Sequence, residues 1–435
     1  MAKFEFGNIN VNVDNILNSF QHFGVHLGLE RIQKLLADLG NPHHQVPVIH
    51  VAGTNGKGSV CAYLSSILTE AGYRVGRYIS PHLVDWNERI CLNEQPISLD
   101  ELEQLLLEVK SAINSNEGSP TQFEVITAAA WLYFARQKVD VAVIEVGLGG
   151  RLDATNVCDR PLVTIVTSIS REHWQVLGPT LADIAREKAG ILKSGCPTVV
   201  GNLPPEAKAV VEKRIEELGC RAVFPAPAKE LLTAEAQRAQ RKEERWVEYQ
   251  GIEYPLLLSG DIQLANSTLA IASVQILQQQ GWQISQLAIV SGMRKTKWPG
   301  RMQWITWQNR TLLIDGAHNP ASAIALRQYV DTLNSQSITW VMGMLSTKDH
   351  ADIFQALLRP CNRLFLVPVP DHSSADPEEL ATLARHVCPD LTLVETHPDL
   401  ISGLQAAISS PPSLIVLCGS LYLIGHFLQI SQNRN

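Results

Sequence analysis

The chain has 435 residues, of which 45% are hydrophobic, and a formal net charge of −7 at pH 7 with a pI near 6.0. At roughly 150 residues per domain, this length predicts two or three globular domains with sizeable cores. The acidic balance provides no basic face of the kind that nucleic acid needs, which argues against nucleic acid as a partner.

The cysteines and the N-terminal residues point to the cytoplasm. The eight cysteines are scattered, with no CxxC pair and no histidine nearby at zinc-ligand spacing, so we interpret them as reduced thiols. The first residues show no basic segment followed by an apolar stretch, and no run of 18 apolar residues occurs. We therefore expect a cytoplasmic protein without a membrane partner.

Residues 53–59, with the sequence GTNGKGS, form the first chemically informative motif. An apolar run precedes them and an amphipathic stretch follows, which predicts a strand, a phosphate-binding loop and a helix. Amides at a helix N-terminus favour anions, and Lys57 adds a mobile positive charge. The standard P-loop pattern differs, because Val51 replaces a glycine and Ser59 follows Lys57 by two places. A tight turn with an exposed lysine is the alternative.

The chain alternates between apolar strand-like runs and helical patterns. Runs at 48–51, 139–146, 162–167 and 197–200 predict a mostly parallel sheet covered by helices. Ligands bind beyond the carboxyl ends of the strands in such sheets, and the residues that follow these runs are polar. The segment 226–248 is charged and alanine-rich, and we interpret it as a solvated helix and β excursion.

A second α/β series begins after a Pro/Gly hinge near residue 299. It predicts strands at 311–314, 338–344, 363–367, 391–395 and 414–418, and helices at 320–333, 351–359, 377–387 and 398–408. This pattern predicts a separate Rossmann-like domain over 297–435, after an ATP-binding domain over 1–296. The second domain has no GxGxxG turn, which argues against a dinucleotide cofactor.

Two residues at predicted strand ends are candidate metal ligands. Glu145 ends a buried strand beside the phosphate loop, where P-loop enzymes hold magnesium. The alternative is a glutamate satisfied by the amides of the following glycine loop or by Arg151. His173 lies in the loop after the next strand, where a histidine can bind a second metal or orient a phosphate, and the alternative is a surface histidine stacked on Trp174.

Lys188 falls within the apolar stripe of a helix predicted from about Leu181. Burial lowers the pKa of a lysine and leaves a neutral amine, which can react with carbon dioxide to form a metal-binding carbamate. The alternative is a lysine whose stem lies on the core while its ammonium group reaches solvent.

In the second domain, residues 315–320 read DGAHNP at the end of a predicted strand. Asn319 and Pro320 fit a helix cap and a first helical turn. Asp315 and His318 are not explained by helix initiation, and Arg301 beside the hinge could pair with a phosphate. The alternative is an Asp–Arg pair at the surface.

Taken together, these segments resemble the folylpolyglutamate synthase/dihydrofolate synthase family within the Mur ligase superfamily. The resemblance runs through most of the chain and includes the departures from the standard P-loop. Its motifs are LGLER at 27–31, HVAGTNGKGS at 50–59, SPHL at 80–83, NERI at 87–90, EVGLGGRLDATN at 145–156, REKAGI at 186–191 and DGAHNP at 315–320.

The resemblance implies an α/β fold with a P-loop-containing, Mur-ligase-like domain of mostly parallel sheet and a C-terminal Rossmann-like domain. It also implies an ATP- and magnesium-dependent ligase that joins L-glutamate to dihydropteroate, to reduced folates, or to both through an acyl phosphate. Two Mg²⁺ ions are expected, with a monovalent cation such as K⁺ as a further candidate, and the protein is expected to be a monomer.

The resemblance also assigns roles to individual residues. ATP would be bound by Gly53, Thr54, Asn55, Gly56, Lys57, Gly58, Ser59, Asn266, Arg301 and Asp315. Metal ligands would be Ser59, Ser80, Glu145 and His173, and the catalytic set would be Lys57, carbamylated Lys188 and His318. The pteroate or folate site would be lined by Gly28, Leu29, Glu30, Thr121, Gln122, Phe123, Glu124, Leu152, Asp153 and Ala154.

Two other functions remain open from the sequence. A Mur-type peptidoglycan-precursor ligase would share the activation step and take a UDP-sugar peptide as acceptor, although the motifs at 80–83 and 186–191 favour the folate branch. A P-loop nucleotide switch would hydrolyse ATP without needing glutamate.

Overall fold

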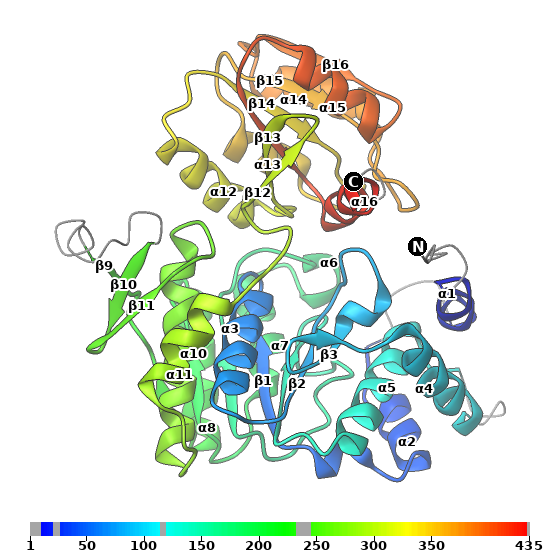
Figure 1. Ribbon diagram of the computed structural model, residues 1–435, viewed down its shortest axis with the longest axis vertical. Coiled ribbons are helices and arrows are strands. Elements are labelled where there is room, and N and C mark those ends of the chain that lie inside the picture. The colour runs from blue at the N-terminus through cyan, green and yellow to red at the C-terminus, as the bar shows by residue number, and fades with distance from the viewer. Residues whose placement is uncertain (1–9, 21–26, 114–118, 232–244, 433–435) are drawn as a thin grey trace, which may run out of the picture. The chain divides into compact units, whose positions relative to one another are not determined.

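The computed structural model describes residues 10–20, 27–113, 119–231 and 245–432 (Figure 1). By their internal contacts the residues divide into two units. The first contains Met1–Leu257 and Leu264–Thr296, and the second contains Leu258–Gln263 and Lys297–Asn435. The short segment Leu258–Gln263 is thus grouped with the second unit and includes the start of the helix Ile262–Gln279, although most of that helix belongs to the first unit.

The first unit is built on a mostly parallel sheet. Among the described residues it has eight strands in the order β4-β3-β2-β5-β1-β6-β7-β8, of which β3 and β4 pair antiparallel. The strands are β1 (Val48–Ala52), β2 (Val75–Tyr78), β3 (Ile90–Leu92), β4 (Gln95–Pro96), β5 (Val141–Glu145), β6 (Val163–Val166), β7 (Thr198–Val200) and β8 (Ala222–Val223). Because β1, β5 and β6 are parallel neighbours, their carboxyl ends meet at one edge of the sheet.

Helices cover this sheet, and α3 packs on β1, β2 and β5. Its partner α11 lies against it, and the hydroxyl of Ser66 donates to the carbonyl oxygen of Gly292 at 2.8 Å. The helices of this unit are α1 (Asn10–Asn18), α2 (Glu30–Asp38), α3 (Lys57–Glu70), α4 (Leu99–Ala112), α5 (Gln122–Arg136), α6 (Trp174–Leu177), α7 (Leu181–Lys188), α8 (Pro205–Leu218), α10 (Ile262–Gln279) and α11 (Gln286–Lys295). Short 3₁₀ helices span Pro42–Gln45, Trp86–Arg89 and Ala189–Ile191.

A small antiparallel sheet and the second unit complete the fold. The small sheet has the order β11-β10-β9, from β9 (Lys229–Glu230), β10 (Trp246–Tyr249) and β11 (Ile252–Pro255). The sheet of the second unit has the order β12-β13-β17-β14-β15-β16, in which β12 alone of the described strands is antiparallel. Its strands are β12 (Gln303–Trp307), β13 (Arg310–Ile314), β14 (Ile338–Met342), β15 (Arg363–Leu366), β16 (Leu393–Thr396) and β17 (Leu414–Cys418).

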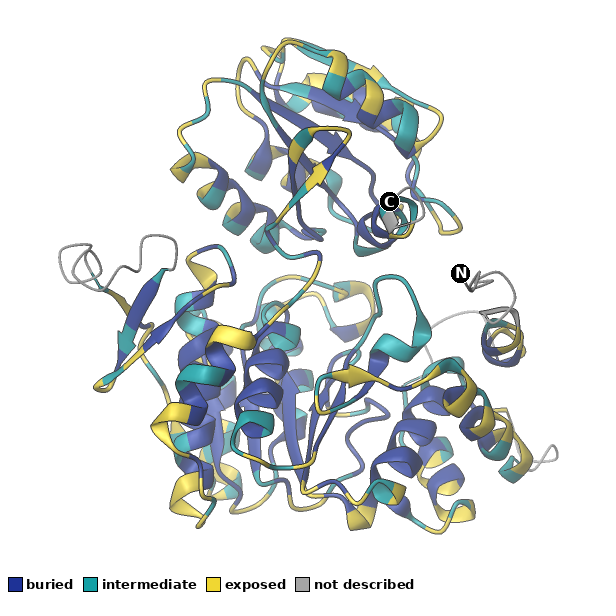
Figure 2. Ribbon diagram, in the orientation of Figure 1, coloured by how far each residue is buried: buried dark blue, intermediate teal, exposed yellow. Residues whose placement is uncertain are grey.

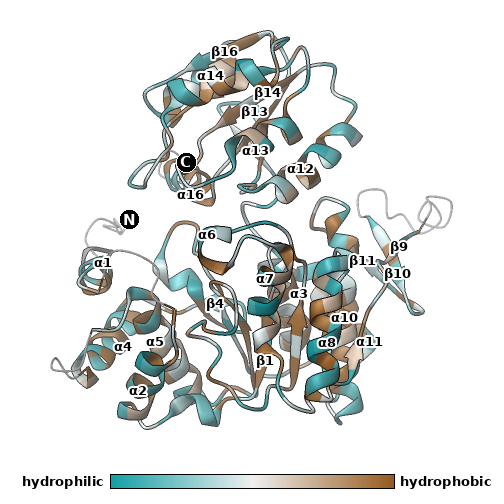
Figure 3. Cartoon of the chain, turned by 180° about the vertical axis from the view of Figure 1, so that it is seen from behind, coloured by the Kyte–Doolittle hydropathy of each residue, from teal (hydrophilic) through white to brown (hydrophobic). Residues whose placement is uncertain are grey.

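The helices of the second unit are amphipathic and enclose a core of buried apolar side chains. They are α12 (Pro320–Thr332), α13 (His350–Leu357), α14 (Pro377–Val387), α15 (Leu400–Ser409) and α16 (Leu421–Gln432). Figure 2 shows that the central strands of both sheets are buried while the outer faces of the helices are exposed, and Figure 3 shows the hydrophobic colouring of β13 and β14. Burial on both faces explains why β14 and β17 are largely apolar.

The predicted fold class is confirmed, including the parallel sheet around the phosphate loop and the C-terminal Rossmann-like series. The four predicted strands of the first unit are present as β1, β5, β6 and β7. The sequence did not predict β2, which contains Arg77, or the antiparallel edge strand β12. In the segment 226–248, β9 and the start of β10 are strands, and the predicted solvated helix falls largely on 232–244, outside the described residues. No helix in the described ranges is both long and apolar enough to cross a membrane.

Candidate active site

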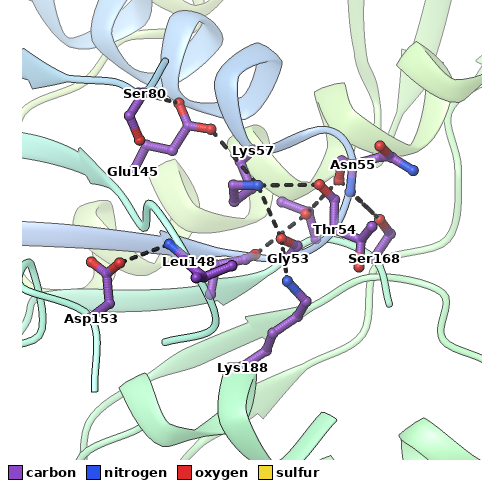
Figure 4. Close-up of polar contacts among 12 residues, drawn as sticks. Gly53, Thr54, Asn55, Lys57, Ser80, Glu145, Leu148, Asp153, Ser168 and Lys188 are labelled. Atoms are coloured by element: carbon purple, nitrogen blue, oxygen red, sulfur yellow. Dashed lines mark hydrogen bonds and ion pairs between the residues drawn. The ribbon is translucent and has the colours of Figure 1, made fainter. Parts of the chain in front are cut away.

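The loop between β1 and α3 has the geometry of a phosphate-binding loop (Figure 4). Gly56 adopts a left-handed conformation (φ 87°) directly before Lys57, the first residue of α3. The Nζ of Lys57 donates to the carbonyl oxygens of Gly53 and Thr54, at 3.1 Å each. Lys57 is only partly exposed, which argues against the alternative of a tight turn with an exposed lysine. The first amides of α3 follow the loop, as an anion site requires.

Close neighbours leave little space for a side chain at two glycines of this loop. A Cβ atom on Gly53, whose φ is 147°, would lie 1.9 Å from Oγ1 of Thr167. A Cβ atom on Gly56 would lie 2.4 Å from the side-chain oxygen of Asn266, a buried residue of α10. A side chain at either position would therefore force the neighbouring side chain or the loop to shift. The second contact also places Asn266 beside the predicted triphosphate cradle.

The loop after β6 forms hydrogen bonds to the phosphate loop, and these contacts were not predicted from the sequence. Ser168 accepts from the backbone N–H of Asn55 at 3.0 Å and donates to its carbonyl oxygen at 2.9 Å. The hydroxyl of Thr167 donates to the same carbonyl oxygen at 2.7 Å. The available signal was the position of both residues directly after a buried strand.

Lys188, at the C-terminal end of α7, points toward the start of the phosphate loop (Figure 4). Its Nζ donates to the carbonyl oxygen of Gly53 at 2.8 Å. Only 4% of the residue is exposed, so the alternative in which its ammonium group reaches solvent is wrong. Burial, with a further contribution from the charge of Lys57, lowers the pKa of Lys188 to about 7. A large share of this amine is therefore neutral at physiological pH.

Glu145 ends β5 and lies between Ser80 and Lys57 (Figure 4). Its Oε2 accepts from the backbone N–H of Ser80 at 3.4 Å, and its Oε1 lies 3.9 Å from Nζ of Lys57. Arg151 forms its ion pair with Glu187 at 2.9 Å, so the alternative that pairs Arg151 with Glu145 is wrong. A buried carboxylate beside a phosphate loop therefore stands where the sequence predicted one.

His173 differs from Glu145 and Lys188 in its exposure. It is exposed and adopts a left-handed conformation (φ 50°) at the N-terminus of the short helix α6. Trp174 is covered by the guanidinium of Arg171, whose carbon lies 4.8 Å from the ring centroid. The role of His173 as a metal ligand stays a prediction.

The three segments predicted to line the pteroate site come together in the first unit. The N–H of Gly28 donates to the carbonyl oxygen of Leu152 at 3.4 Å. The ring of Phe123 lies against the loop after β5, because a Cβ on Gly147 would lie 2.5 Å from it. Thr121 caps α5 and accepts from the N–H of Glu124 at 3.2 Å.

Glu124 and Asp153 have more structural partners than the sequence indicated. Glu124 accepts from the N–H of Thr121 at 2.7 Å and from Nε of Arg31 at 3.1 Å. Asp153 accepts from the N–H of Leu148 at 2.8 Å, and burial raises its pKa despite the hydrogen bonds that stabilise its charge. Glu124 thus joins two segments that are distant in sequence, whereas Asp153 holds the loop that directly precedes it.

In the second unit, Asp315 follows β13 and is bound by backbone amides. Its Oδ2 accepts from the N–H of Met302 and its Oδ1 from the N–H of Ala317, both at 2.8 Å. Asp315 is 5% exposed, so a surface Asp–Arg pair does not describe it. Burial raises its pKa, while the charge of Arg301 acts in the opposite direction. The Nδ1 of His318 donates to the carbonyl oxygen of Gly316 at 2.7 Å, and thus the structure gathers Arg301, Asp315 and His318 around one turn.

Comparison with known proteins decides the family. Residues 51–274 match the family model described as the Mur ligase middle domain, and residues 301–430 match the dihydrofolate synthetase C-terminal domain. The chain is 34% identical to dihydrofolate synthetase of Saccharomyces cerevisiae, over 94% of this chain and 99% of that protein. It is 35% identical to dihydrofolate synthase/folylpolyglutamate synthase of Bacillus subtilis, over 92% of this chain and 94% of that protein.

The chain belongs to the folylpolyglutamate synthase/dihydrofolate synthase family. Solved structures of this family share its fold. The E. coli FolC in complex with DHPP and ADP matches with a TM-score of 0.83 and 30% identity, over 97% of this chain and 98% of that one. The Mycobacterium tuberculosis folylpolyglutamate synthase complexed with ADP and AMPPCP matches with a TM-score of 0.84 and 29% identity, over the same shares.

Proposed function

We propose that this protein is an ATP-dependent amide ligase that adds L-glutamate to dihydropteroate and to folates already carrying glutamate. The proposal rests above all on the loop in which Lys57 and Lys188 both donate to the carbonyl oxygen of Gly53, with Glu145 3.9 Å from Lys57. This site belongs to a family whose members are named for both reactions, and the FolC structure contains ADP.

The chemistry requires activation of a poor acylating agent. A carboxylate does not react with an amine at neutral pH, so the γ-phosphoryl group of ATP first converts it to an acyl phosphate, which the glutamate amine then attacks. Negative charge builds up on the phosphoryl oxygens during transfer. In our proposal Lys57 and the amides at the start of α3 stabilise that charge.

Magnesium fits the residues beside Lys57. No group of three or more His, Cys, Asp or Glu side chains in the described ranges is placed to hold a metal ion. Magnesium bound to ATP needs fewer protein ligands, because phosphates and water supply most of its octahedral shell. The buried carboxylate of Glu145, which lies 3.4 Å from the backbone nitrogen of Ser80, would hold it together with the hydroxyls of Ser80 and of Ser59 in the first turn of α3. Bound there, Mg²⁺ would neutralise phosphoryl charge.

Lys188 has a different role in the proposal. Its neutral amine would add to carbon dioxide and release a proton, which leaves a carbamate whose carboxylate replaces a buried amine. A carbamate at this position would provide a second oxygen ligand close to the phosphate loop. The lowered pKa of Lys188 supports this role, because only the neutral amine reacts.

The proposal has further parts that concern metals, nucleotide contacts, oligomeric state and location. A second magnesium at His173, a monovalent cation such as K⁺, ATP contacts from Arg301 and Asp315, a monomeric state and the cytoplasm as location stay predictions. The pteroate acceptor would lie against Phe123 and Asp153, which adjoin the loop after Glu145. That placement would bring its carboxylate toward the same strand ends as the nucleotide.

The test is ADP release with glutamate and ATP held constant while dihydropteroate and tetrahydrofolate are offered separately, with the pterin products identified by mass. Products from both acceptors support the bifunctional proposal, and product from one alone restricts it to that acceptor. Phosphate release that continues unchanged without glutamate or acceptor, with no pterin amide formed, contradicts it.

A further inference from the structure

A chain of buried hydrogen bonds runs from the central strand β1 to Asp153. The Nε2 atom of His50 lies 2.9 Å from Oγ1 of Thr155, and Oγ1 of Thr155 lies 2.5 Å from Oδ1 of Asp153. His50 and Thr155 are each 1% exposed. Water therefore does not compete for these hydrogen bonds, and their geometry is set by the fold alone.

The direction of this chain follows from the chemistry of its members. A carboxylate only accepts, so the single hydroxyl proton of Thr155 is donated to Asp153. The oxygen of Thr155 must then accept from His50, which places the imidazole proton on Nε2. Burial, with a smaller effect from the charge of Lys193, lowers the pKa of His50 to about 3, so the ring is neutral at physiological pH.

At its other end, the chain holds the glycine-rich loop 147–150. The Oδ2 of Asp153 accepts from the N–H of Leu148 at 2.8 Å (Figure 4), and its Oδ1 also accepts from the N–H of Thr155 at 3.0 Å. Leu148 follows Gly147, which lies against the ring of Phe123. The loop thus follows Glu145 closely in the chain and packs against the ring of Phe123.

We propose that His50 and Thr155 are positioning residues that hold Asp153, and through it the loop 147–150, in the geometry that binds the pterin acceptor. The inference rests on the proposed function, since it assigns this loop to the acceptor. The nucleotide is bound elsewhere in our proposal, by the loop between β1 and α3. Loss of the chain should therefore weaken the acceptor site and leave nucleotide affinity unchanged.

Thr155 provides a matched pair of variants. Thr155→Val keeps the shape and removes the hydroxyl, whereas Thr155→Ser keeps the hydroxyl. We expect Thr155→Val to raise the KM for dihydropteroate by about tenfold or more, the size that loss of a hydrogen bond to a charged group produces. The Kd for ADP should stay within about twofold, and Thr155→Ser should restore the acceptor KM.

His50 provides the second step of the test. In His50→Gln the amide N–H₂ can take the place of the Nε2 donor, whereas His50→Leu removes it. If the residues act as one chain, the double variant His50→Leu/Thr155→Val should be no worse than Thr155→Val, because each removes the same connection. Fully additive losses would contradict the chain.

A control and a substrate-free measurement separate this inference from the proposed function. Thr198→Val removes another buried hydroxyl of the same sheet, which donates to the carbonyl oxygen of Thr164 at 3.2 Å, and should leave the acceptor KM unchanged. Hydrogen exchange of 147–153 should be about tenfold faster in Thr155→Val, with exchange of 53–59 unaltered. Unchanged exchange of 147–153 overturns the inference even if ligase activity is present. Faster exchange supports the chain even if the wild type makes no pterin amide.

Discussion

The amine of Lys188 lies 2.8 Å from the carbonyl oxygen of Gly53, although the two residues are 135 positions apart. This hydrogen bond joins the end of α7 to the first residue of the phosphate loop. It also explains why a lysine is tolerated in a buried position, because the amine has a partner there. The state of this amine should govern both stability and activity.

The first prediction is that Lys188→Met stabilises the protein at pH 7. The folded-state pKa of Lys188 is about 7 against an ordinary value of 10.5, so between these values the unfolded chain binds a proton that the folded chain does not. Burial of Lys188 therefore lowers the free energy of unfolding most below pH 7, and this loss disappears as the pH rises through 10.5. We expect a gain of about 2 kcal/mol at pH 7, after the lost hydrogen bond is included. Urea unfolding in CO₂-free buffer should show this gain shrinking toward pH 10, and a gain independent of pH would contradict it.

The second prediction concerns the carbamate. Lys188→Ala should lower kcat by about 100-fold or more, as expected when a group that stabilises the transition state is removed. Short carboxylates such as acetate should restore part of the rate by occupying the space of the carbamate. Lys193→Ala, which removes another partly buried lysine of the same unit, should neither lose much activity nor respond to acetate. Full activity of Lys188→Ala, without rescue, would remove Lys188 from the mechanism.

The third prediction separates backbone strain from crowding in the phosphate loop. Gly56 (φ 87°) and Gly72 (φ 90°) share a left-handed conformation, but a Cβ meets Asn266 at Gly56 and nothing within 4 Å at Gly72. Gly72→Ala should therefore cost only about 1 kcal/mol. Gly56→Ala should cost more and raise the Kd for ADP at least about tenfold. Thermal unfolding and ADP titration measure both, and equal effects of the two variants would show that crowding at Gly56 is unimportant.

The fourth prediction tests the magnesium ligand. Glu145→Gln keeps the size of the side chain and removes its charge, so kcat should fall by about 100-fold and more Mg²⁺ should be needed for half-maximal ADP release. Glu94→Gln is the control, because Glu94 pairs with Arg77 at 2.6 Å and has no predicted contact with metal. A normal magnesium dependence in Glu145→Gln would exclude this carboxylate as a ligand.

The fifth prediction concerns Asp315. Asp315→Asn leaves one acceptor oxygen for the two amides of Met302 and Ala317, so one buried N–H loses its partner. We expect the free energy of unfolding to fall by about 1–3 kcal/mol. Asp352→Asn, at an exposed site of the same unit, should change it by less than about 0.5 kcal/mol. Comparable losses in both variants would contradict the role of the two amides.

The sequence alone determined the features that depend on neighbouring residues. Apolar runs followed by glycines or polar residues predicted β1, β5 and β6 and the loop at 53–59, because strand periodicity and turn chemistry act over a few residues. Asn319 was predicted as a helix cap for the same reason, and the structure confirms its hydrogen bond to the N–H of Ser322 at 2.9 Å. Strand β2 was not predicted, because Arg77 interrupts its apolar pattern and finds its partners, Cys91 and Glu94, in β3 and the turn that follows it.

The tertiary structure decided which polar side chains are buried and what they contact. The helical pattern placed Lys188 on an apolar face but could not distinguish a buried amine from one that reaches solvent, since that depends on the carbonyl oxygen of Gly53 lying beside the end of α7. The link from His50 through Thr155 to Asp153 likewise joins residues about 100 positions apart. Such contacts leave no periodic trace in the chain, because desolvation and hydrogen-bond partners are set by packing between distant segments.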